Sequence, residues 1–512
     1  MENSLKLFDF SQKINFKNEL LAGFTVAMTM IPESLSFAIL AGLSPLTGLY
    51  AAFMMGLVTA IFGGRPGMVS GGAGATIVVL IALIKTHGVE YLFATVALAG
   101  VFQMLVGIFR LGKFVRLIPQ PVMYGFLNGL AVIIFMAQVE QFKITDANGV
   151  VTWLQGSSLY IMLGLTALTI AIVYFFPKIT KVVPSSLIAI LIVFGVVVGF
   201  GIHTKTVADI ARISGNLPSF HIPEIPFSLE TLQIIFPYAL IMAGVGLIES
   251  LLTLSMVDEI TNSKGNTNKE AVAQGLANVT NGFFGGMGGC AMVAQTLVNL
   301  NAGSRARLSG IIASLTILII ILVGAPFIEK IPMAALVGVM MMVAISTFQW
   351  VSISIINKMP KSDIFVGITV ALITIILHNL ALAVLVGVII SALVFAWDNA
   401  KRIRARKLTD ENGIKYYQIS GPLFFGSVTT FIDKFDPAND PDQVVIDFKE
   451  SRIVDMSAID ALDKLSKKYT QQNKKLHLRH LSEDCRKMLK NAEAVIEVNI
   501  QDDPTYKVMP EK

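Results

Sequence analysis

The stretch GVGLIESLLTLSMVDEI (residues 244–260) decides the fold of this chain, because it is an apolar helix with one carboxylate, Glu249, inside it. A carboxylate in hydrocarbon is costly, so an acidic residue within a membrane helix predicts a functional site. A polar hairpin and a second apolar segment then lead to the glycine cluster FGGMGGC (284–290) and to a short apolar segment that ends before Arg305. Glycines that interrupt a membrane helix are tolerated only where the freed backbone groups are buried in protein or line a cavity. The stretch therefore predicts a binding site halfway through a membrane.

The same order of features occurs once more, near the start of the chain. PESL (32–35) places Glu33 in the first apolar helix, FGG (62–64) follows it, and SGGAGAT (70–76) opens a short apolar segment. IESL (248–251) and the second FGG repeat this order later in the chain. A carboxylate helix followed by a broken short helix in each half is typical of transporters built from internal repeats.

The composition indicates a polytopic membrane protein with a soluble tail. Of the 512 residues, 54% are hydrophobic and 15% are charged, whereas about 25% are charged in an ordinary soluble domain. Apolar runs long enough to cross a bilayer recur between residues 20 and 400, and residues 401–512 resemble a soluble domain. Two cysteines, Cys290 and Cys485, give no disulfide framework, and the first apolar helix lacks a signal-peptide cleavage pattern. The net charge of +5 lies mostly in the helix flanks and predicts no nucleic-acid partner.

Apolar length predicts fourteen membrane segments, in two sets of seven separated by a polar connector (203–230). We expect the first set at 19–40, 45–63, 70–86, 90–110, 119–141, 157–176 and 182–202. We expect the second set at 232–258, 268–284, 289–302, 306–326, 331–350, 362–378 and 380–398. The expected domains are an N-terminal cytoplasmic segment (1–18), a transport domain (19–400, with repeats at 19–202 and 232–398) and a small tail domain (408–512).

Basic residues predict the orientation of these segments. One side carries Lys13, Lys17, Arg110, Lys113, Arg116, Lys178, Lys181, Arg305, Arg307, Lys358, Lys361 and the run KRIRARK (401–407). The other side carries Lys85, Lys143, Lys205, Arg212 and Lys330. The richer side is expected to be cytoplasmic. Both termini then lie in the cytoplasm, and because seven is odd, the second repeat enters from the opposite face, so the repeats are inverted.

The tail predicts a small α/β domain. Residues 414–420, 443–448 and 475–480 are expected to be strands, because they are short and rich in β-branched and aromatic residues or alternate in polarity. Residues 456–472 and 483–492 are expected to be helices. Strands that alternate with helices indicate an α/β fold.

The short segments that begin near Ser70 and Gly289 predict an anion site. If they are half-helices that meet in mid-membrane, each points free backbone N–H groups and its positive dipole end at one spot, which binds an anion without a buried cation. Thr76, Gln295 and Thr296 can add donors. The alternative is that the glycines serve tight helix packing. We favour packing for Gly63-Gly64 and Gly285-Gly286, and the site for residues 71–74 and 288–289.

Two carboxylates, Glu33 and Glu249, would flank the anion and repel it, which predicts that a proton or Na⁺ neutralises each of them during transport. Thr253, four residues after Glu249, lies on the same helix face and can supply an oxygen ligand to Na⁺. The alternative for Glu249 is a structural hydrogen bond to a neighbouring helix. The alternative for Glu33 is a local bond to backbone groups that Pro32 leaves free.

The remaining polar residues are interpreted as structural. The charged residues of the hairpin are expected to form a mostly solvated face: Asp258, Glu259, Lys264, Lys269 and Glu270. Asn128 is expected to form a hydrogen bond between helices. His203, His221 and His378 lack partners at metal-ligand spacing. The sequence contains no P-loop, nucleotide-binding glycine fingerprint or nucleophile elbow, so we expect neither an ATP-driven pump nor an enzyme.

The chain resembles the sulfate permease (SulP) family of anion transporters over nearly its full length. The residues that carry the resemblance are PESLSFA (32–38), AGLSP (41–45), GLY (48–50), ESLLT (249–253), GLAN (275–278) and FGG (284–286). The tail is similar to a STAS domain, with Asp455-Met456-Ser457-Ala458 where such domains place an Asp-x-Ser motif before a helix.

The resemblance implies an all-α polytopic fold of two inverted sevens, shared with uracil permeases, with two short half-helices and short strands at the site. A core (spans 1–4 and 8–11) would hold the substrate between the third and tenth spans and move against a gate (spans 5–7 and 12–14). Homodimers linked through the STAS domain are expected in the lipid bilayer.

The resemblance also implies site residues. Relatives use a carboxylate at the position of Glu249, with nearby hydroxyl and backbone oxygens, for Na⁺, and others couple to H⁺. The coupling-ion set is therefore Glu249, Thr253 and Gly289, with Glu249 and Thr253 as Na⁺ ligands. The predicted substrate-binding set is Glu33, Phe37, Gly72, Ala73, Gly74, Ala75, Thr76, Gly289, Cys290, Ala291 and Gln295.

Two departures from the family pattern bear on the substrate. Many relatives begin the tenth span with Ser-Arg or Ala-Arg, whereas this chain has Ala294-Gln295. The missing cation weakens the case for a doubly charged anion such as sulfate and favours bicarbonate or another monovalent anion. The third span also lacks the proline that is often found there.

The expected function is secondary active transport of a small inorganic anion, bicarbonate or sulfate, coupled to Na⁺ or H⁺ by elevator-like alternating access. The expected location is a bacterial inner membrane, and no cofactor is expected beyond Na⁺ as the coupling ion. One alternative is an anion sensor or regulator that acts through the STAS domain on a cytoplasmic partner. In that case Ser457 is a regulatory phosphorylation site, or it only caps a helix. Another alternative is nucleobase or dicarboxylate transport on the same fold.

Overall fold

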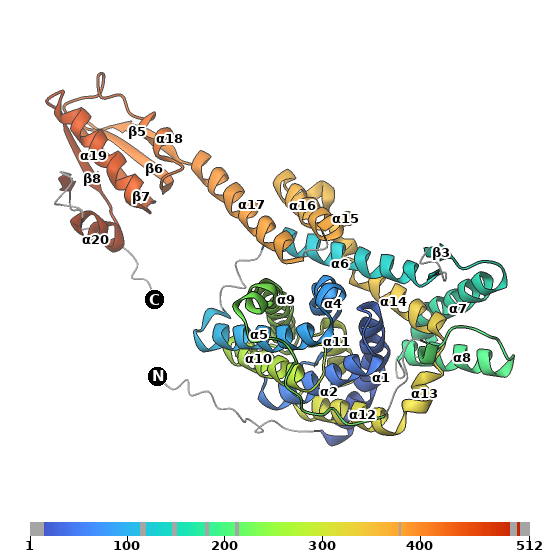
Figure 1. Cartoon of the computed structure of the whole chain (residues 1–512). Helices are drawn as coiled ribbons and strands as arrows, with labels where there is room; N and C mark the ends of the chain where they lie inside the picture. Colours follow the sequence, from blue (N-terminus) through green and yellow to red (C-terminus); the bar gives the residue numbers. More distant parts are fainter. Residues whose placement is uncertain are drawn as a thin grey trace. The chain divides into compact units, whose positions relative to one another are not determined.

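The computed structural model describes residues 15–112, 119–145, 151–179, 184–209, 215–377, 380–491 and 499–501 (Figure 1). Most of the expected cytoplasmic segment 1–18 lies outside the described residues. So do several residues considered above: Lys13, Lys113, Arg116, Lys181, Arg212 and His378. The chain divides into two compact units, Met1–Val388 and Ile389–Lys512, and each is described by itself.

In the described ranges, seven segments make up the first half of the membrane unit, at the predicted positions. They are α1 (Phe16–Leu40), α2 (Pro45–Phe62), an interrupted segment of β1 (Ser70–Gly71), α3 (Gly74–Val78) and α4 (Ile81–His87), then α5 (Val89–Ile108), α6 (Gln120–Glu140), α7 (Ser157–Ile179) and α8 (Ser185–Gly199). Three short elements lie in the connections: β2 (Lys143–Thr145), β3 (Val151–Trp153) and η2 (Val207–Asp209).

The second half repeats this order. It comprises α9 (Leu229–Thr261), α10 (Thr267–Phe283), an interrupted segment of β4 (Cys290–Ala291) and α11 (Val293–Asn301), then α12 (Leu308–Val323), α14 (Met333–Thr347), α16 (Lys361–Leu377) and α17 (Leu380–Lys401). The connections hold α13 (Ala325–Glu329), α15 (Trp350–Ser354) and η3 (Ile356–Lys358). Seven of the described helices are long and apolar enough to cross a membrane, and α8, α12 and α14 are shorter apolar helices. The predicted polytopic fold of two sets of seven segments is confirmed.

The two interrupted segments meet in an antiparallel strand pair. Ser70 pairs with Ala291, and Gly71 pairs with Cys290. Antiparallel pairing of corresponding strands agrees with a two-fold relation between inverted repeats. A Cβ atom on Gly289 would lie 1.9 Å from the carbonyl oxygen of Gly71, so no residue with a side chain fits there without a shift of the backbone. The predicted interruption of both segments is confirmed.

The membrane helices pack in two groups. One contains α1, α2, α5, α9, α10, α11 and α12, and the other contains α6, α7, α8, α14 and α16. Gly100 of α5 and Gly275 of α10 face each other, because a Cβ atom on either would lie 2.5 Å from the carbonyl oxygen of the other. Small residues at such interfaces let helix backbones approach closely. The two groups correspond to the core and the gate that the resemblance implies.

The second unit contains a sheet with the order β5-β6-β7-β8-β9. The predicted elements are present: β6 (Lys415–Leu423), β7 (Gln443–Ile453), β8 (Lys475–Arg479), α19 (Met456–Thr470) and α20 (Glu483–Asn491). The prediction missed β5 (Arg404–Thr409), α18 (Val428–Ile432) and β9 (Asn499–Gln501). β5 pairs antiparallel with β6 at the edge of the sheet. It begins within the basic run 401–407, whose charges are used above to predict topology. Charged side chains on an edge strand also prevent the addition of another strand.

Candidate functional site

The candidate site lies where β1 and β4 pair, between the beginnings of α3 and α11. α3 begins at Gly74, and α11 begins at Val293. The first hydrogen bonds inside these helices are donated by the amides of Ile77 and Thr296. The amides that precede them in each first turn are therefore not used within the helix, and each helix begins here with the positive end of its dipole. Two helix starts thus meet at one strand pair.

The glycines before α3 allow side chains to approach the backbone closely. A Cβ atom on Gly74 would lie 2.3 Å from the ring of Phe37, and one on Gly72 would lie 2.6 Å from Cε of Met287. Ala73 packs with Cys290 and Met292 in a small buried cluster. The structure thus brings most of the predicted substrate set together around β1 and β4.

Two further predicted residues, Ala75 and Thr76, lie buried in the first turn of α3. The hydroxyl of Thr76 donates to the carbonyl of Ala73 at 2.9 Å. On the opposite segment, the hydroxyl of Thr296 accepts a hydrogen bond from the amide of Val69 at 3.0 Å. Both hydroxyls therefore hold the interrupted segments in place.

Glu33 of α1 is in direct contact with Gln295 of α11. Glu33 is 7% exposed, Gln295 is 4% exposed, and Nε2 of Gln295 donates to Oε2 of Glu33. This bond joins repeat one to repeat two across 262 positions of sequence. Among the described residues, no backbone group donates a hydrogen bond to the carboxylate of Glu33. The partner of Glu33 is therefore a distant side chain, and the local backbone alternative is wrong.

Glu249 of α9 contacts the same strand pair, on its β4 side. The thiol of Cys290 donates to Oε2 of Glu249 at 3.0 Å, and no described residue donates to Oε1. The next residue, Ser250, accepts the amide of Ala291 at 3.1 Å. One turn further, the hydroxyl of Thr253 donates to the carbonyl of Glu249 at 2.8 Å. These contacts place Glu249 and Ser250 of α9 beside β4.

A side chain that the sequence analysis left without a role, Asn278 of α10, holds Gly289. Oδ1 of Asn278 accepts the amide of Gly289 at 2.9 Å, and Nδ2 donates to the carbonyl of Gly289 at 3.0 Å. The same Nδ2 donates to Oε1 of Gln103 at 2.9 Å. The carbonyl of Gly289, a predicted ion ligand, therefore already accepts one hydrogen bond.

Asn278 belongs to a row of buried polar side chains on α10. Glu270, Gln274, Asn278 and Asn281 are at most 1% exposed. Gln274 donates from Nε2 to Ser70 of β1 and to Glu270, at 2.8 Å in both cases. α10 thus holds the interrupted segments of both repeats. These polar residues follow one another at intervals of four, four and three positions within a predicted span, and this helical spacing is the signal that would have revealed the row.

The hairpin charges only partly follow the prediction. Glu259 and Lys264 are exposed, as expected for a solvated face. Asp258 forms an ion pair with Nε of Arg65 at 3.1 Å. The prediction is wrong for Lys269 and Glu270, which are 8% and 1% exposed, because they lie at the start of α10 where it packs inside the core. The second carboxylate oxygen of Glu270 accepts the amide of Gly64 at 2.7 Å.

The packing interpretation is confirmed for Gly64 and Gly286, and the interpretation of Asn128 is confirmed as well. A Cβ atom on Gly64 would lie 2.0 Å from the backbone oxygen of Asn266, and one on Gly286 would lie 1.9 Å from the side chain of Asn281. Both glycines therefore allow close packing. Gly285 instead has a positive φ of 71°, and an added Cβ atom there would meet nothing nearer than 3.9 Å. Asn128 of α6 donates to Ser352 at 2.9 Å and accepts the amide of Gln349 at 2.7 Å, which joins α6 to α15.

In the STAS-like unit, Ser457 lies exposed in the first turn of α19. The cap of this helix is Asp455, which accepts the amide of Ala458 at 2.9 Å. Its other oxygen accepts the amide of Phe425 at 2.7 Å. The interpretation of Ser457 as the helix cap is therefore wrong, because Asp455 precedes it and fills that role.

Comparison with protein families and curated proteins adds independent findings. The profile of the sulfate permease family matches residues 16–370, and that of the STAS domain matches residues 405–505. The chain is 40% identical to the putative sulfate transporter YbaR of Bacillus subtilis, over 93% of this chain and 97% of that protein. It is 30% identical to the bicarbonate transporter BicA of a Picosynechococcus species, over 88% of this chain and 87% of that protein.

Solved structures agree in fold. The transmembrane domain of a cyanobacterial bicarbonate transporter BicA matches with a TM-score of 0.61 and 29% identity, over 74% of this chain and 98% of that chain. The inward-facing murine anion transporter Slc26a9 matches with a TM-score of 0.80 over 94% of this chain and 88% of that chain. The identity to Slc26a9 is 18%, so this second likeness concerns the fold alone.

Proposed function

This chain belongs to the sulfate permease family, and we propose that it is a secondary active transporter of a small inorganic anion, coupled to Na⁺ or H⁺. The observation that carries the proposal is the pairing of β1 with β4, which sets the starts of α3 and α11 beside Glu33 and Glu249. Free amides and the positive ends of helix dipoles bind anions. Interrupted helices that meet near the bilayer midplane are the usual substrate sites of repeat-built transporters.

The anion is proposed to be bicarbonate or another monovalent ion ahead of sulfate. The named relatives include sulfate transporters and bicarbonate transporters. Gln295 stands where many relatives have arginine, and its amide donates to Glu33, so it adds no positive charge. Amides and helix dipoles alone favour an anion with one charge, because a second charge is costly to remove from water without a cation beside it.

Coupling is proposed to work through Glu249. A carboxylate beside an anion must be neutralised, and Oε1 of Glu249 receives no hydrogen bond from the described residues. The hydroxyl of Thr253 uses its hydrogen on the carbonyl of Glu249, so its lone pairs remain available to a hard cation. Na⁺ at these oxygens, or a proton on Glu249, would offset the repulsion while the anion is bound.

Motion is proposed to be elevator-like. The group of helices that holds both interrupted segments packs internally, and it borders the other group through contacts of α1 with α8 and α14. A rigid core that moves along a separate gate carries its site across the membrane without unfolding it. The termini are proposed to be cytoplasmic, and a homodimer is proposed as the assembly.

The test is uptake by the purified protein in liposomes. Labelled bicarbonate, sulfate, chloride and dicarboxylates are offered with an imposed Na⁺ gradient, a pH gradient or neither. We expect uptake of one inorganic anion to rise with an inward gradient of one cation and to fall when an ionophore collapses that gradient. Uptake that ignores both gradients contradicts coupling, and competition by uracil but not by bicarbonate or sulfate favours nucleobase transport instead.

A second candidate function is a sensor that acts through the STAS domain, and the exposed position of Ser457 in the first turn of α19 favours it. A phosphate there would lie at a helix N-terminus, where added negative charge is stabilised. Deletion of residues 408–512 separates the two functions. A transporter loses or changes its uptake rate, whereas a pure sensor retains anion binding and shows no uptake before or after the deletion.

A further inference from the structure

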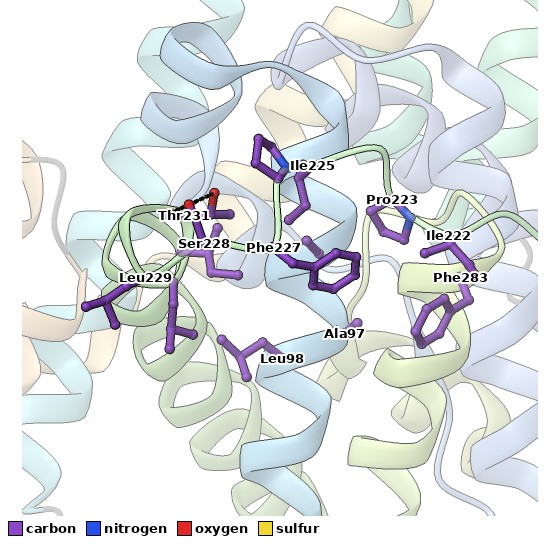
Figure 2. Close-up of a pocket in the computed structure, with 14 residues that line it drawn as sticks. Ala97, Leu98, Ile222, Pro223, Ile225, Phe227, Ser228, Leu229, Thr231 and Phe283 are labelled. Atoms are coloured by element: carbon purple, nitrogen blue, oxygen red, sulfur yellow. Dashed lines mark hydrogen bonds between the residues drawn. The ribbon is translucent and has the colours of Figure 1, made fainter.

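A groove of about 530 Å³ lies at one end of the core helices. Its walls are α5, the connector residues 222–228 and the first turns of α9, as Figure 2 shows. Phe283 at the end of α10 lies beside the connector residues Ile222 and Pro223 (Figure 2). The volume falls within the range of about 300–1,000 Å³ that is typical of pockets for small organic molecules.

The side chains that line this groove are almost all apolar. Ala94, Ala97 and Leu98 of α5 face connector and α9 residues that are almost all aliphatic, aromatic or proline. The two hydroxyls in the lining, Ser228 and Thr231, lie 3.1 Å apart and bond to each other, and Ser228 also accepts the amide of Thr231 as the cap of α9. Apolar cavities without free polar groups do not hold ordered water. The groove therefore suits a hydrocarbon chain.

The groove is continuous with the lipid-facing surface of the core. Leu229, Leu232 and Phe236 extend from it along α9 as exposed apolar side chains, and Val101 continues its α5 wall. Exposed apolar rows on membrane helices face lipid. At 1.5 Å per residue, Ala94 to Leu98 lie about 8 to 14 Å along α5 from its start at Val89.

Acidic groups surround the outer end of the groove. Glu224 of the connector and Glu230 in the first turn of α9 are exposed. Glu90 at the start of α5 accepts the amide of Glu224 at 3.0 Å and lies 3.7 Å from Nε2 of His221. Carboxylates at headgroup level attract a cationic amine and repel an anionic headgroup.

From the apolar lining, the opening toward lipid and the acidic rim, we propose that the groove binds one acyl chain of an amine-bearing phospholipid such as phosphatidylethanolamine. The bound chain packs between α5, the connector and the beginning of α9. α9 carries Glu249 further along the same helix, so the lipid contacts the element that holds one side of the transport site. This site does not depend on which anion is transported.

Photolabelling of the full-length protein in nanodiscs tests the proposal. The probe is phosphatidylethanolamine with a diazirine in one acyl chain, and labelled peptides are located by mass spectrometry. We expect the label to concentrate on residues 222–235 and on α5 near Ala94. Ala94→Trp fills the groove and is expected to reduce this label by about tenfold, because the chain loses the burial of several CH₂ groups. Leu105→Trp, three turns further along the same helix at an exposed position, is the matched control and should leave the label unchanged.

A second pair of variants covers the case in which Ala94→Trp does not fold. Phe227 is 95% exposed, so Phe227→Ala removes a wall of the groove without disturbing the core, and it is expected to lower the same label several-fold. Leu240→Ala, on the exposed face of α9 outside the groove, is its control. More label after Phe227→Ala would show that this ring itself occupies the groove and would overturn the proposal. Label spread evenly over the lipid-facing helices, or equal labelling by a phosphatidylglycerol probe, would also overturn it.

Discussion

The two halves of the site share a backbone arrangement but differ in how they hold their carboxylates. In repeat one, Glu33 is buried and receives a hydrogen bond from Gln295 of the opposite repeat. In repeat two, Glu249 is only partly buried and receives a bond from the thiol of Cys290, a weak donor, in its own repeat. Glu33 therefore links the two repeats through Gln295, whereas the bond to Glu249 comes from within its own repeat.

The helices that precede the two interrupted segments, α2 and α10, also differ, because α10 buries more polar side chains. α2 buries mostly apolar residues and glycines, among them Met54, Met55 and Gly56, and its buried polar residues are the threonines Thr47 and Thr59. α10 buries Gln274, Asn278 and Asn281 and presents amides to both strands. Each repeat thus supplies one interrupted segment, whereas the side-chain amides of Gln274 and Asn278 that hold both segments come from repeat two.

The largest expected effect separates the two carboxylates. Glu249→Gln should lower cation-driven uptake by about 100-fold, because it removes the negative charge that the coupling cation would neutralise, and a loss of about 3 kcal/mol in cation binding corresponds to about that factor. Glu33→Gln keeps an acceptor for Gln295 and should lower uptake by about tenfold or less. Initial rates in liposomes measure both, with thermal unfolding as the control for folding. Equal losses in the two variants would contradict the asymmetry between the repeats.

A smaller effect is expected when the polar support of α10 is removed. Asn278→Ala leaves both backbone groups of Gly289 unpaired, and buried unpaired groups cost about 1–3 kcal/mol each, so a loss of about 3 kcal/mol is expected. Asn281→Ala is the matched control on the same helix face, because within the described ranges the side-chain amide of Asn281 donates to Ala277 of its own helix, at 2.9 Å, and to no other residue. Thermal unfolding of the purified protein measures the difference. A control variant as unstable as Asn278→Ala would mean that α10 does not support β4 in particular.

The smallest effect concerns a carboxylate whose oxygens are fully used, Asp440 of the STAS domain. It accepts hydrogen bonds from Lys415 at 2.5 Å, from Tyr417 at 2.8 Å and from Tyr469. Burial alone would raise the pKa of Asp440, but these hydrogen bonds together hold its pKa below the usual value. A lowered folded-state pKa stabilises the fold above the unfolded pKa of about 3.9, and this contribution is lost as the pH falls through the folded pKa.

Hydrogen exchange of β6 and α19 in the full-length protein measures this pH dependence. Protection should stay constant from pH 7 to about 4 and decline below that, by about 1.4 kcal/mol for each unit by which the pKa is lowered. Asp440→Asn should remove the decline and leave cation coupling unchanged. A decline that persists in Asp440→Asn would assign the acid sensitivity to other groups.

Much of the site was predictable because its signals are local in the chain. Glu33 and Glu249 stand out as charges inside apolar runs, and the glycines at 71–74 and 288–289 stand out as breaks in short spans. The role of Asn278 was not predicted, although its spacing from Gln274 marks one helix face. A single polar residue in a membrane span is compatible with many hydrogen bonds, and only the fold selects the partner.

The sequence by itself determined the membrane segments, the two interruptions and the α/β character of the tail, because apolar run length, glycine clusters and residue alternation act over a few neighbouring residues. Only the tertiary structure decided that Gln295 clamps Glu33 and that Gln274 holds Ser70, pairs that are 262 and 204 positions apart. It also decided that Glu270 is buried rather than solvated. These outcomes depend on which helices pack side by side, and no local pattern in the chain specifies that.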